Sequence, residues 1–342
     1  PNKFDMDITL NFATISSGKT FELPESSSII DAAELAGITL PHSCKNGRCN
    51  TCKCMITGPT KTLFDELGLS KHEKAMGWKL ACARYATGNI SVDILDLSDL
   101  NLARPKILPT KIHSLEIMSK NVLKVKLRLS QKNNFEFIEG QHIDLIGPKG
   151  IRRSYSLASH CNSHLLELHV RRLDGGQMSN YLFGDAKVGD LLRIKGPYGT
   201  FTLRNTIGRN LAFLATGTGI APFKAMLERI SRLPESDRPK SISVFWGGRN
   251  LDELYWDPRS VLPDVSFIPV LSQPKDDWAG AQGYAQDVMI ENYTKIENLL
   301  VYACGSELMI HSAEKQWKDN NFDLTNFFTD AFVTSGIERG VV

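Results

Sequence analysis

The chain has 342 residues and a mass of 38.1 kDa, so two or three domains are expected from a typical domain size of about 150 residues. Forty Lys and Arg against 38 Asp and Glu leave a formal net charge of +2, which excludes a strongly basic surface for nucleic acid or membranes. No apolar run has the length of a membrane span, and Pro1 to Asp5 lack a signal-peptide layout, so a cytoplasmic protein is expected.

The first part of the chain, residues 1–100, is predicted to contain both strands and a helix. Alternating apolar residues predict strands at Ile8–Phe12 and Thr20–Leu23. A short helix is predicted over Ser28–Ala36, with Ser28 as its N-cap and Gly37 as its C-terminal stop. A loop rich in cysteine follows this helix.

The cysteine loop has the spacing of a two-iron cluster site. Cys44, Cys49 and Cys52 form a C-x4-C-x2-C pattern, and Cys82 supplies a fourth thiolate from later in the chain. Clustered thiols in a reducing compartment more often hold a metal or an iron-sulfur cluster than a disulfide. Gly47 permits a positive φ, which lets the backbone curl round a cluster with its N–H groups facing the sulfurs.

Two alternatives to the cluster stay open. Four thiolates also suit a structural zinc ion, although zinc sites normally use paired C-x2-C elements, and buried structural thiols need no metal. Cys54 breaks the spacing and is expected in the hydrophobic core. The role of Cys161 is left unassigned.

A β-barrel is predicted for residues 104–205. Arg104-Pro105-Lys106 is expected to be a linker, because proline continues neither a helix nor a central strand. From Lys111 to about Leu203 strand follows strand, most clearly in the alternating apolar positions 123–129 and in the segments 166–170 and 191–194. A small antiparallel barrel accounts for this pattern.

Two motifs in the barrel region suggest a nucleotide cofactor. Arg153 and Tyr155 lie on one side of a strand, where a guanidinium can meet a pyrophosphate and an aromatic ring can pack on a flat heterocycle. Gly175-Gly176 opens a short helix whose N–H groups can bind a phosphate. Taken alone, Arg and Tyr on a barrel surface also fit simple exposure to solvent.

From Asn210 onward, strands alternate with helices, which predicts a parallel α/β sheet over residues 206–342. Gly217-Thr218-Gly219 follows an apolar strand and opens a helix, where a dinucleotide pyrophosphate is commonly held. Pro222 occupies the third glycine position of the Rossmann fingerprint. An ordinary strand-to-helix turn is therefore the alternative.

The motifs, in this order, resemble the ferredoxin-NADP⁺ reductase-like superfamily over the whole chain, in its subgroup with an N-terminal plant-type 2Fe-2S ferredoxin domain. The resemblance implies that Arg153 and the helix at Gly176 hold the FAD diphosphate, that Tyr155 stacks on the isoalloxazine and that Ser156 bonds the flavin near its reactive nitrogen. The same resemblance implies further FAD contacts at His169, Val170, Arg171, Met178 and Ser179.

In the nicotinamide lobe, the resemblance assigns coenzyme binding to Gly217, Thr218, Gly219, Pro222, Gly247, Arg249, Cys304 and Gly305. It places Cys304 beside the nicotinamide and Phe332, in Asp330-Ala331-Phe332, over the flavin face. Ser156, Cys304 and Phe332 are thus the expected residues of the reacting centre. A buried core thiol and a core phenylalanine are the alternatives for the last two.

The expected protein is a three-domain reductase: a β-grasp 2Fe-2S domain at 1–100, an FAD-binding antiparallel barrel at 104–205 and an NAD(P)H-binding α/β domain at 206–342. Its electrons are expected to pass from NADH through FAD and the cluster to a partner enzyme. The resemblance implies a pyridoxamine-dependent dehydrase, as for CDP-6-deoxy-3,4-glucoseen reductases, or an oxygenase component of an aromatic-ring oxygenase. A colourless, non-enzymatic, zinc-stabilised nucleotide-binding module is the alternative of another class.

The preferred coenzyme depends on one turn. Arg249 can pair with a 2′-phosphate and would favour NADPH, whereas Asp252 and Glu253 can accept from a ribose 2′-hydroxyl and would repel a phosphate. One basic residue beside two acidic ones is a poor phosphate site. NADH is therefore expected, with NADPH as the alternative.

Overall fold

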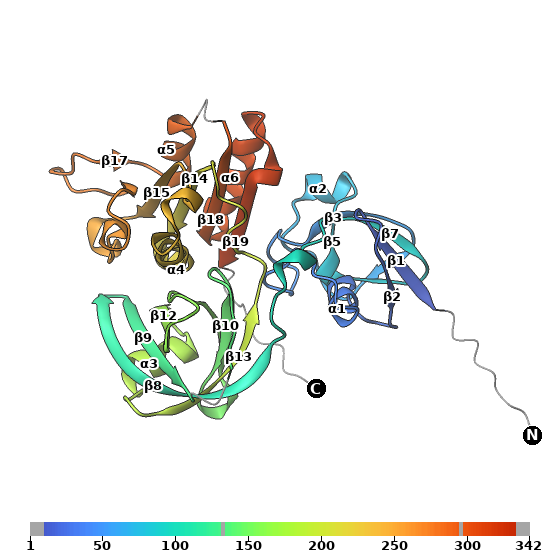
Figure 1. Ribbon diagram of the computed structural model, residues 1–342, viewed down its shortest axis with the longest axis horizontal. Helices are drawn as coiled ribbons and strands as arrows, with labels where there is room; N and C mark the ends of the chain where they lie inside the picture. The colour runs from blue at the N-terminus through green and yellow to red at the C-terminus, as the bar shows by residue number, and fades with distance from the viewer. Residues whose placement is uncertain (1–9, 131–133, 294–296, 333–342) are drawn as a thin grey trace, which may run out of the picture. The chain divides into compact units, whose positions relative to one another are not determined.

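The computed structural model describes residues 10–130, 134–293 and 297–332, and the chain divides into two compact units, Pro1–Leu102 and Ala103–Val342 (Figure 1). The predicted strand at 8–12 begins outside the described residues, and the strand that the structure shows there is β1, Asn11–Ile15.

The first unit is a mixed five-stranded sheet in the order β2-β1-β7-β3-β5, with helix α1 against it. Strand β1 runs parallel to β7 and antiparallel to β2, and β3 is antiparallel to both β7 and β5. This is the expected β-grasp arrangement. The elements are β1 Asn11–Ile15, β2 Thr20–Leu23, α1 Ile29–Leu35, β3 Lys53–Thr57, α2 Lys71–Ala75, β5 Lys79–Leu80 and β7 Ile90–Asp93, with β4 Thr60–Thr62 and β6 Arg84–Ala86 in a separate ladder.

Helix α1 begins and ends where its sequence predicts. The Ser28 hydroxyl accepts the Asp31 N–H at 3.0 Å, and Gly37 takes a φ of 76° just beyond the C-cap. Ile29, Ile30 and their neighbours on the same face are buried in the core of the unit. Burial of each such side chain contributes about 1.5–3 kcal/mol, so packing rather than length stabilises this short helix.

The first half of the second unit is a closed antiparallel sheet in the order β11-β10-β13-β8-β9-β12. The Ala158 N–H, just after β11, donates to the Glu167 carbonyl in β12 at 2.8 Å, which joins the two edges as a barrel requires. Predicted linker residue Lys106 is the first residue of β8. The elements are β8 Lys106–Ser119, β9 Val122–Leu129, β10 His142–Ile146, β11 Arg152–Ser156, β12 Leu165–Arg171, α3 Gln177–Gly184 and β13 Leu191–Tyr198.

The second half is a six-stranded parallel sheet in the order β17-β16-β15-β14-β18-β19. Phe213 in β14 stacks on Phe223 of α4 with ring centroids 4.7 Å apart, and on the other side of the sheet Phe245 packs on Tyr293 after α5. Both faces are therefore covered, which is why the strands are continuously apolar. The elements are β14 Asn210–Thr216, α4 Ile220–Ser231, β15 Ser241–Gly248, β16 Ser266–Leu271, β17 Ala281–Gln282, α5 Ala285–Asn292, β18 Leu299–Ser306, α6 Glu307–Asp319 and β19 Phe327–Phe332.

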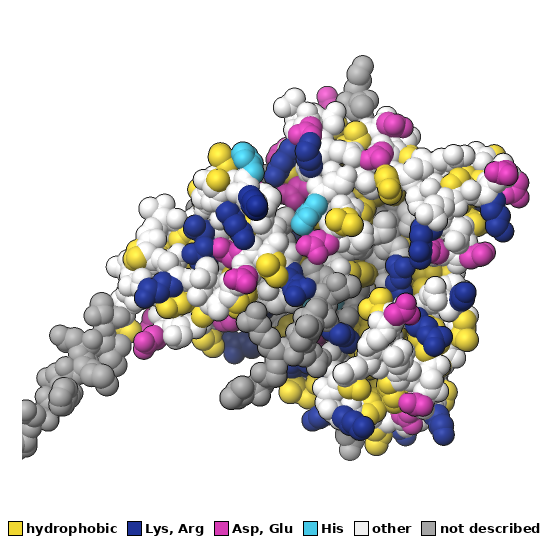
Figure 2. Space-filling model, turned by 180° about the vertical axis from the view of Figure 1, so that it is seen from behind, with side chains coloured by type: hydrophobic (Ala, Val, Ile, Leu, Met, Phe, Trp, Pro, Cys, Tyr) yellow, Lys and Arg dark blue, Asp and Glu magenta, His cyan; other side chains and the backbone are white. Residues whose placement is uncertain are grey.

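The surface carries charges of both signs. On the face shown in Figure 2, Lys and Arg are interspersed with Asp and Glu, as the formal net charge of +2 leads one to expect. None of the helices in the described ranges is long and apolar enough to cross a bilayer.

Candidate functional site

Four cysteines of the first unit lie in two pairs. The Cys44 and Cys49 thiols are hydrogen-bonded to each other, and so are the Cys52 and Cys82 thiols. The Cys49 N–H also donates to the Cys44 sulfur at 3.3 Å. Hydrogen bonds from the Cys49 thiol and from backbone N–H groups, including that of Asn46, lower the pKa of Cys44 to about 6 although burial acts against them.

Local backbone geometry positions these thiols. Cys52 precedes β3 and Cys82 follows β5, and the pairing of those strands together with the Ala81 N–H on the Cys52 carbonyl at 3.0 Å brings the two cysteines together. Gly47 has a φ of 75°, and a Cβ there would lie 2.5 Å from the Asp65 carbonyl oxygen. Only glycine fits this curl of the loop.

The donor set fits an iron-sulfur cluster. Soft thiolates in two adjacent pairs match two iron atoms with two cysteines each, and N–H donors aimed at sulfur tune such a site. Cys54 is fully buried in the core of the unit, and burial raises its pKa to about 12. It therefore behaves as a core thiol.

A buried carboxylate that sequence reasoning missed braces the loop. Glu66 accepts from the Leu80 N–H at 2.7 Å and from the Arg84 Nε at 3.1 Å. Burial alone would raise the pKa of Glu66, but these hydrogen bonds and the Arg84 charge lower it. The brace spans the segment that leads to Cys82.

In the barrel, Arg153 and Tyr155 occupy one face of β11. On the opposite face Asp144 accepts from Ser154 Oγ at 2.5 Å and from Arg152 Nε at 2.9 Å. The Tyr155 ring packs against the barrel core, and its burial raises the pKa of the phenol while the nearby Arg153 charge acts in the other direction. The structure thus brings a guanidinium and an aromatic ring together, as the sequence predicts.

Ser156, at the end of β11, carries an orphaned polar atom. Its Oγ is buried and has no hydrogen-bond partner within the described residues. Such a group costs about 1–3 kcal/mol in a folded protein. A ligand with a polar ring edge would satisfy it, so the site fits a flavin.

At helix α3, the fold itself uses the side chains that the resemblance singles out. The Ser179 hydroxyl accepts the Leu173 N–H at 3.2 Å, and the Met178 side chain is fully buried in the barrel core. Gly176 is the N-cap, with no side-chain cap on the helix, and a Cβ there would lie 2.6 Å from Ser179 Oγ. What the helix start offers to a phosphate is therefore its first backbone N–H groups.

Strand β12 sends alternate residues to opposite sides. Val170 packs in the barrel core, whereas His169 points away from it and hydrogen-bonds Glu167 and Tyr255. Arg171 is exposed, and one guanidinium nitrogen lies 3.1 Å from where a Cβ of Gly217 would be. The Val170 and His169 side chains are thus occupied by the protein, and Arg171 lies against the Gly217 turn.

Strand register gathers the remaining predicted residues at the carboxyl edge of the parallel sheet. Thr216 pairs with Gly247, Ala215 with Cys304, and Ser306 with Phe332. The turn 217–219, Gly247, Arg249, Cys304, Gly305 and Phe332 therefore lie on the edge where α/β sheets bind ligands.

The glycines at this edge permit close backbone approach. A Cβ on Gly219 would lie 2.1 Å from the Cys304 carbonyl oxygen, and one on Gly305 would lie 2.3 Å from Thr216 Oγ1. Pro222 is buried in the first turn of α4, where a backbone N–H has no helical partner, so proline costs no hydrogen bond there. This explains the departure from the Rossmann fingerprint.

Cys304 and Phe332 belong to one apolar cluster. Cys304 is fully buried, and burial, together with the charge of Asp330, raises the pKa of its thiol well above the ordinary value. Cys304 is therefore a neutral thiol. Phe332 is half-buried and packs against the same core.

Arg249 is held by its own turn. Its Nε donates to Glu253 Oε1 at 2.9 Å, and its backbone N–H donates to Glu253 Oε2 at 3.1 Å. The guanidinium is thus neutralised by a carboxylate. This arrangement suits a ribose hydroxyl better than a phosphate dianion.

A second group of metal-type side chains, Glu139, His160 and Cys161, has its ligand atoms within 4.8 Å of one another. The Asn162 N–H donates to His160 Nδ1 at 3.0 Å, so the ring proton is on Nε2, which faces Glu139 at 3.5 Å. Burial and Glu139 raise the pKa of Cys161 to about 11. The Cys161 N–H also donates to Glu139 Oε1 at 2.9 Å, so the contacts within this group support the fold.

Comparison with known proteins agrees with these three regions. Residues 13–87 match the 2Fe-2S iron-sulfur cluster binding domain family, 109–203 the oxidoreductase FAD-binding domain family and 213–315 the oxidoreductase NAD-binding domain family. The chain is 33% identical to the CDP-6-deoxy-L-threo-D-glycero-4-hexulose-3-dehydrase reductase of Yersinia pestis, over 96% of this chain and 100% of that protein.

The chain belongs to the ferredoxin-NADP⁺ reductase-like superfamily, in the subgroup with a 2Fe-2S domain. It is also 31% identical to the anthranilate 1,2-dioxygenase electron transfer component of Acinetobacter baylyi, over 91% of this chain and 92% of that protein. The solved cytochrome P450 reductase GcoB of Amycolatopsis is similar with a TM-score of 0.73, 25% identity and coverage of 95% of this chain and 100% of that chain.

The three domain families make this chain an NAD(P)H-dependent oxidoreductase that uses FAD and a 2Fe-2S cluster. The expectations of fold class and cofactors are thereby confirmed. A non-enzymatic zinc-stabilised module finds no support in these matches.

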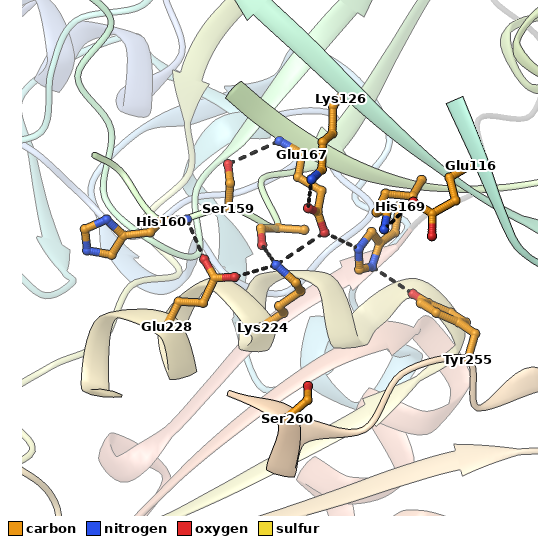
Figure 3. A network of polar contacts seen from close by, with 12 residues as sticks. Glu116, Lys126, Ser159, His160, Glu167, His169, Lys224, Glu228, Tyr255 and Ser260 are labelled. Atoms are coloured by element: carbon orange, nitrogen blue, oxygen red, sulfur yellow. Dashed lines mark hydrogen bonds and ion pairs between the residues drawn. The ribbon is translucent and has the colours of Figure 1, made fainter. Parts of the chain in front are cut away.

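Sequence reasoning missed a polar network between the FAD-binding and NAD-binding domains, which Figure 3 shows. Glu167 and His169 come from the barrel strand β12, Lys224 comes from α4, and Tyr255 follows β15. The signal available in the sequence was a pair of polar residues alternating with buried leucine and valine in 166–170. That alternation separates an apolar from a polar face of β12 but does not show that the polar face is buried.

Proposed function

We propose that this reductase takes electrons from NADH and delivers them one at a time to a deoxysugar dehydrase. FAD, when bound, accepts an electron pair as hydride from NADH and releases single electrons to the 2Fe-2S cluster. The observation that carries the proposal is the 33% identity to the hexulose-3-dehydrase reductase across 96% of this chain and 100% of that protein. We also propose the domain limits 1–100, 104–205 and 206–342.

The barrel residues bind and orient FAD in this proposal. Arg153 and the first N–H groups of α3 hold the diphosphate, and Tyr155 lies against the isoalloxazine. Ser156 gains the hydrogen-bond partner that its buried hydroxyl lacks. A buried hydroxyl in a fixed place selects one orientation of the ring, because any other orientation leaves it unsatisfied.

The carboxyl edge of the parallel sheet binds the coenzyme. The Gly217–Gly219 turn and the start of α4 receive the pyrophosphate, because the free backbone N–H groups of a helix start bind phosphate. Cys304 is a neutral thiol that packs beside the nicotinamide and excludes water, and Phe332 covers the flavin face when the coenzyme is absent. Exclusion of water protects hydride transfer from competing reactions.

The four paired thiols, Cys44, Cys49, Cys52 and Cys82, hold the cluster in the first unit. Their support is the two-by-two pairing and the convergence of backbone N–H groups on Cys44. NADH rather than NADPH is the proposed coenzyme, because Glu253 occupies the Arg249 guanidinium that a 2′-phosphate would need.

The test is reconstitution with candidate acceptors. The holoenzyme is mixed with NADH and either a purified CDP-6-deoxyhexulose-3-dehydrase with its sugar substrate or the oxygenase component of an aromatic-ring dioxygenase. The proposal expects the sugar product to depend on this reductase and NADH, and to be lost with Cys82→Ser while NADH-ferricyanide activity persists. Turnover with the oxygenase alone would contradict the proposed partner.

A further inference from the structure

A buried series of polar and aromatic contacts joins the barrel to the coenzyme domain and ends at the turn 217–219. His169 Nε2 lies 2.9 Å from Glu167 Oε1, and His169 Nδ1 lies 3.0 Å from Tyr255 Oη (Figure 3). The His169 side chain is only 1% exposed. Its ring is therefore held at both nitrogens in a buried site.

The protons of the Glu167, His169 and Tyr255 side chains can be placed in one consistent way. Although burial raises it, His169 and Lys224 lower the pKa of Glu167 to about 2, so the carboxylate is ionised and accepts from Nε2–H. Burial lowers the pKa of His169 and raises that of Tyr255, so a neutral ring accepts at Nδ1 from a phenol. Tyr255 thus donates, and every polar atom of the ring is satisfied.

From Tyr255 the contacts continue to the coenzyme turn. The Tyr255 ring meets Trp246 edge-on, with centroids 5.1 Å apart, and Trp246 Nε1 donates to the Gly217 carbonyl at 3.0 Å. Trp246 is fully buried, so it has no freedom to move independently of either neighbour. The position of Gly217 is thus tied to that of Tyr255.

A second set of contacts, made by Lys224 of helix α4, also connects β12 to the Gly217 turn. Lys224, in the second turn of α4, lies 3.3 Å from Glu167 Oε1 and donates to the Ala158 carbonyl at 3.1 Å and to Glu228 at 2.5 Å. Because α4 begins directly after Gly219, these contacts fix the start of the helix against β12. Glu167 is therefore shared by both sets of contacts.

We propose that His169 is a positioning residue for hydride transfer: through its hydrogen bond from Tyr255, it sets the Gly217 turn against strand β12 of the FAD-binding barrel. The inference rests on the proposed function, since it concerns where the nicotinamide lies relative to the flavin. The His169 side chain acts through Tyr255 and Trp246, because both of its ring nitrogens are already bound by protein groups.

Two amide substitutions separate the two nitrogens of His169. The side-chain amide of asparagine is as many bonds from Cα as Nδ1, and that of glutamine is as many bonds from Cα as Nε2. His169→Asn therefore keeps an acceptor for Tyr255 and loses Glu167, whereas His169→Gln keeps the Glu167 contact and loses Tyr255. Tyr255→Phe removes the same hydrogen bond from the other side, and Tyr293→Phe is its control, a buried tyrosine on the opposite face of the sheet.

The experiment measures kcat/KM for NADH with ferricyanide, FAD content and hydrogen exchange of residues 213–222. Tyr255→Phe and His169→Gln are each expected to lower kcat/KM about tenfold, the loss of one buried hydrogen bond. They are also expected to increase exchange in 213–222 with and without FAD, at unchanged FAD content. His169→Asn is expected to exceed His169→Gln about fivefold in kcat/KM.

Equal values for the asparagine and glutamine variants, or a Tyr255→Phe variant that behaves as Tyr293→Phe does, would overturn the positioning role. Lost FAD binding in Tyr255→Phe would also overturn it, because the contact would then serve general folding. A wild-type holoenzyme that does not oxidise NADH would instead refute the proposed function, and the exchange data would still report whether Tyr255 holds the turn.

Discussion

The unsatisfied hydroxyl of Ser156 leads to a prediction whose sign depends on FAD. In the apoprotein, Ser156→Ala removes a buried polar atom that has no partner within the described residues. Such an atom costs about 1–3 kcal/mol. The substitution is therefore expected to stabilise the apoprotein by about 1 kcal/mol, which raises the Tm by about 2–4 °C for a unit of this size.

The holoprotein is expected to respond in the opposite direction. With FAD bound, the same hydroxyl has a partner, and its removal forfeits a hydrogen bond of about 0.5–1.5 kcal/mol. The difference between the two states is about 1.5 kcal/mol or more, which weakens FAD binding by at least about tenfold. Thermal unfolding of the apoprotein measures the change in its stability, and fluorescence titration with FAD measures the change in FAD affinity.

Ser154→Ala is the matched control, two residues earlier on the same strand. The Ser154 hydroxyl donates to Asp144 Oδ1 at 2.5 Å, so its loss is expected to destabilise the apoprotein and leave FAD affinity unchanged. If Ser156→Ala lowers apoprotein stability as Ser154→Ala does, the Ser156 hydroxyl already has a partner and our reasoning about the flavin site is refuted.

Four further predictions concern other parts of the chain. Cys54→Ser is expected to keep iron content and the visible spectrum, whereas Cys82→Ser loses the cluster; the reverse result would refute the ligand assignment. Wild-type kcat/KM is expected to favour NADH over NADPH, and Glu253→Gln to shift the ratio toward NADPH by about three- to tenfold, because it frees a guanidinium; an NADPH preference in the wild type would contradict this. The pKa of Glu167 is depressed to about 2, so the ionised carboxylate is expected to stabilise the fold above about pH 4.5 and to lose this effect as the pH falls toward 2. In urea unfolding, the difference in free energy of unfolding between wild type and Glu167→Gln should therefore narrow over this pH range. A difference that stays constant would contradict this role of Glu167. Residues 104–342 alone are expected to bind FAD and to reduce ferricyanide with NADH, and failure to bind FAD would move the proposed domain boundary.

The sequence predicts best those parts of the site that are built from residues close together in the chain. Cysteine spacing alone groups Cys44, Cys49 and Cys52, because a tight loop with Gly47 at positive φ forces the thiols inward. The strand-glycine-helix order likewise predicts the turn at Gly217, since a helix start is recognisable from the residues around it.

Contacts between distant segments were beyond such reasoning. Glu66 braces Leu80 and Arg84 from 14 and 18 residues away, and His169 meets Tyr255 across 86 residues. Alternation in β12 separates apolar from polar positions but does not say which domain covers the polar face. Nothing in the sequence around Glu167, His169 or Tyr255 marks them as special. Their pKa values are shifted only because the three side chains are buried in contact with one another.

The network across β12 also constrains how such a chain can be recombined. A crossover near residue 103, between the two compact units, would exchange the cluster-bearing module and leave Glu167, His169, Lys224 and Tyr255 from one parent. A crossover between 203 and 210 would pair the barrel of one parent with the coenzyme domain of another and leave buried charges without their partners, at several kcal/mol. Chimeras and natural fusions are therefore expected to inherit the last two domains as one block, with these four positions covarying.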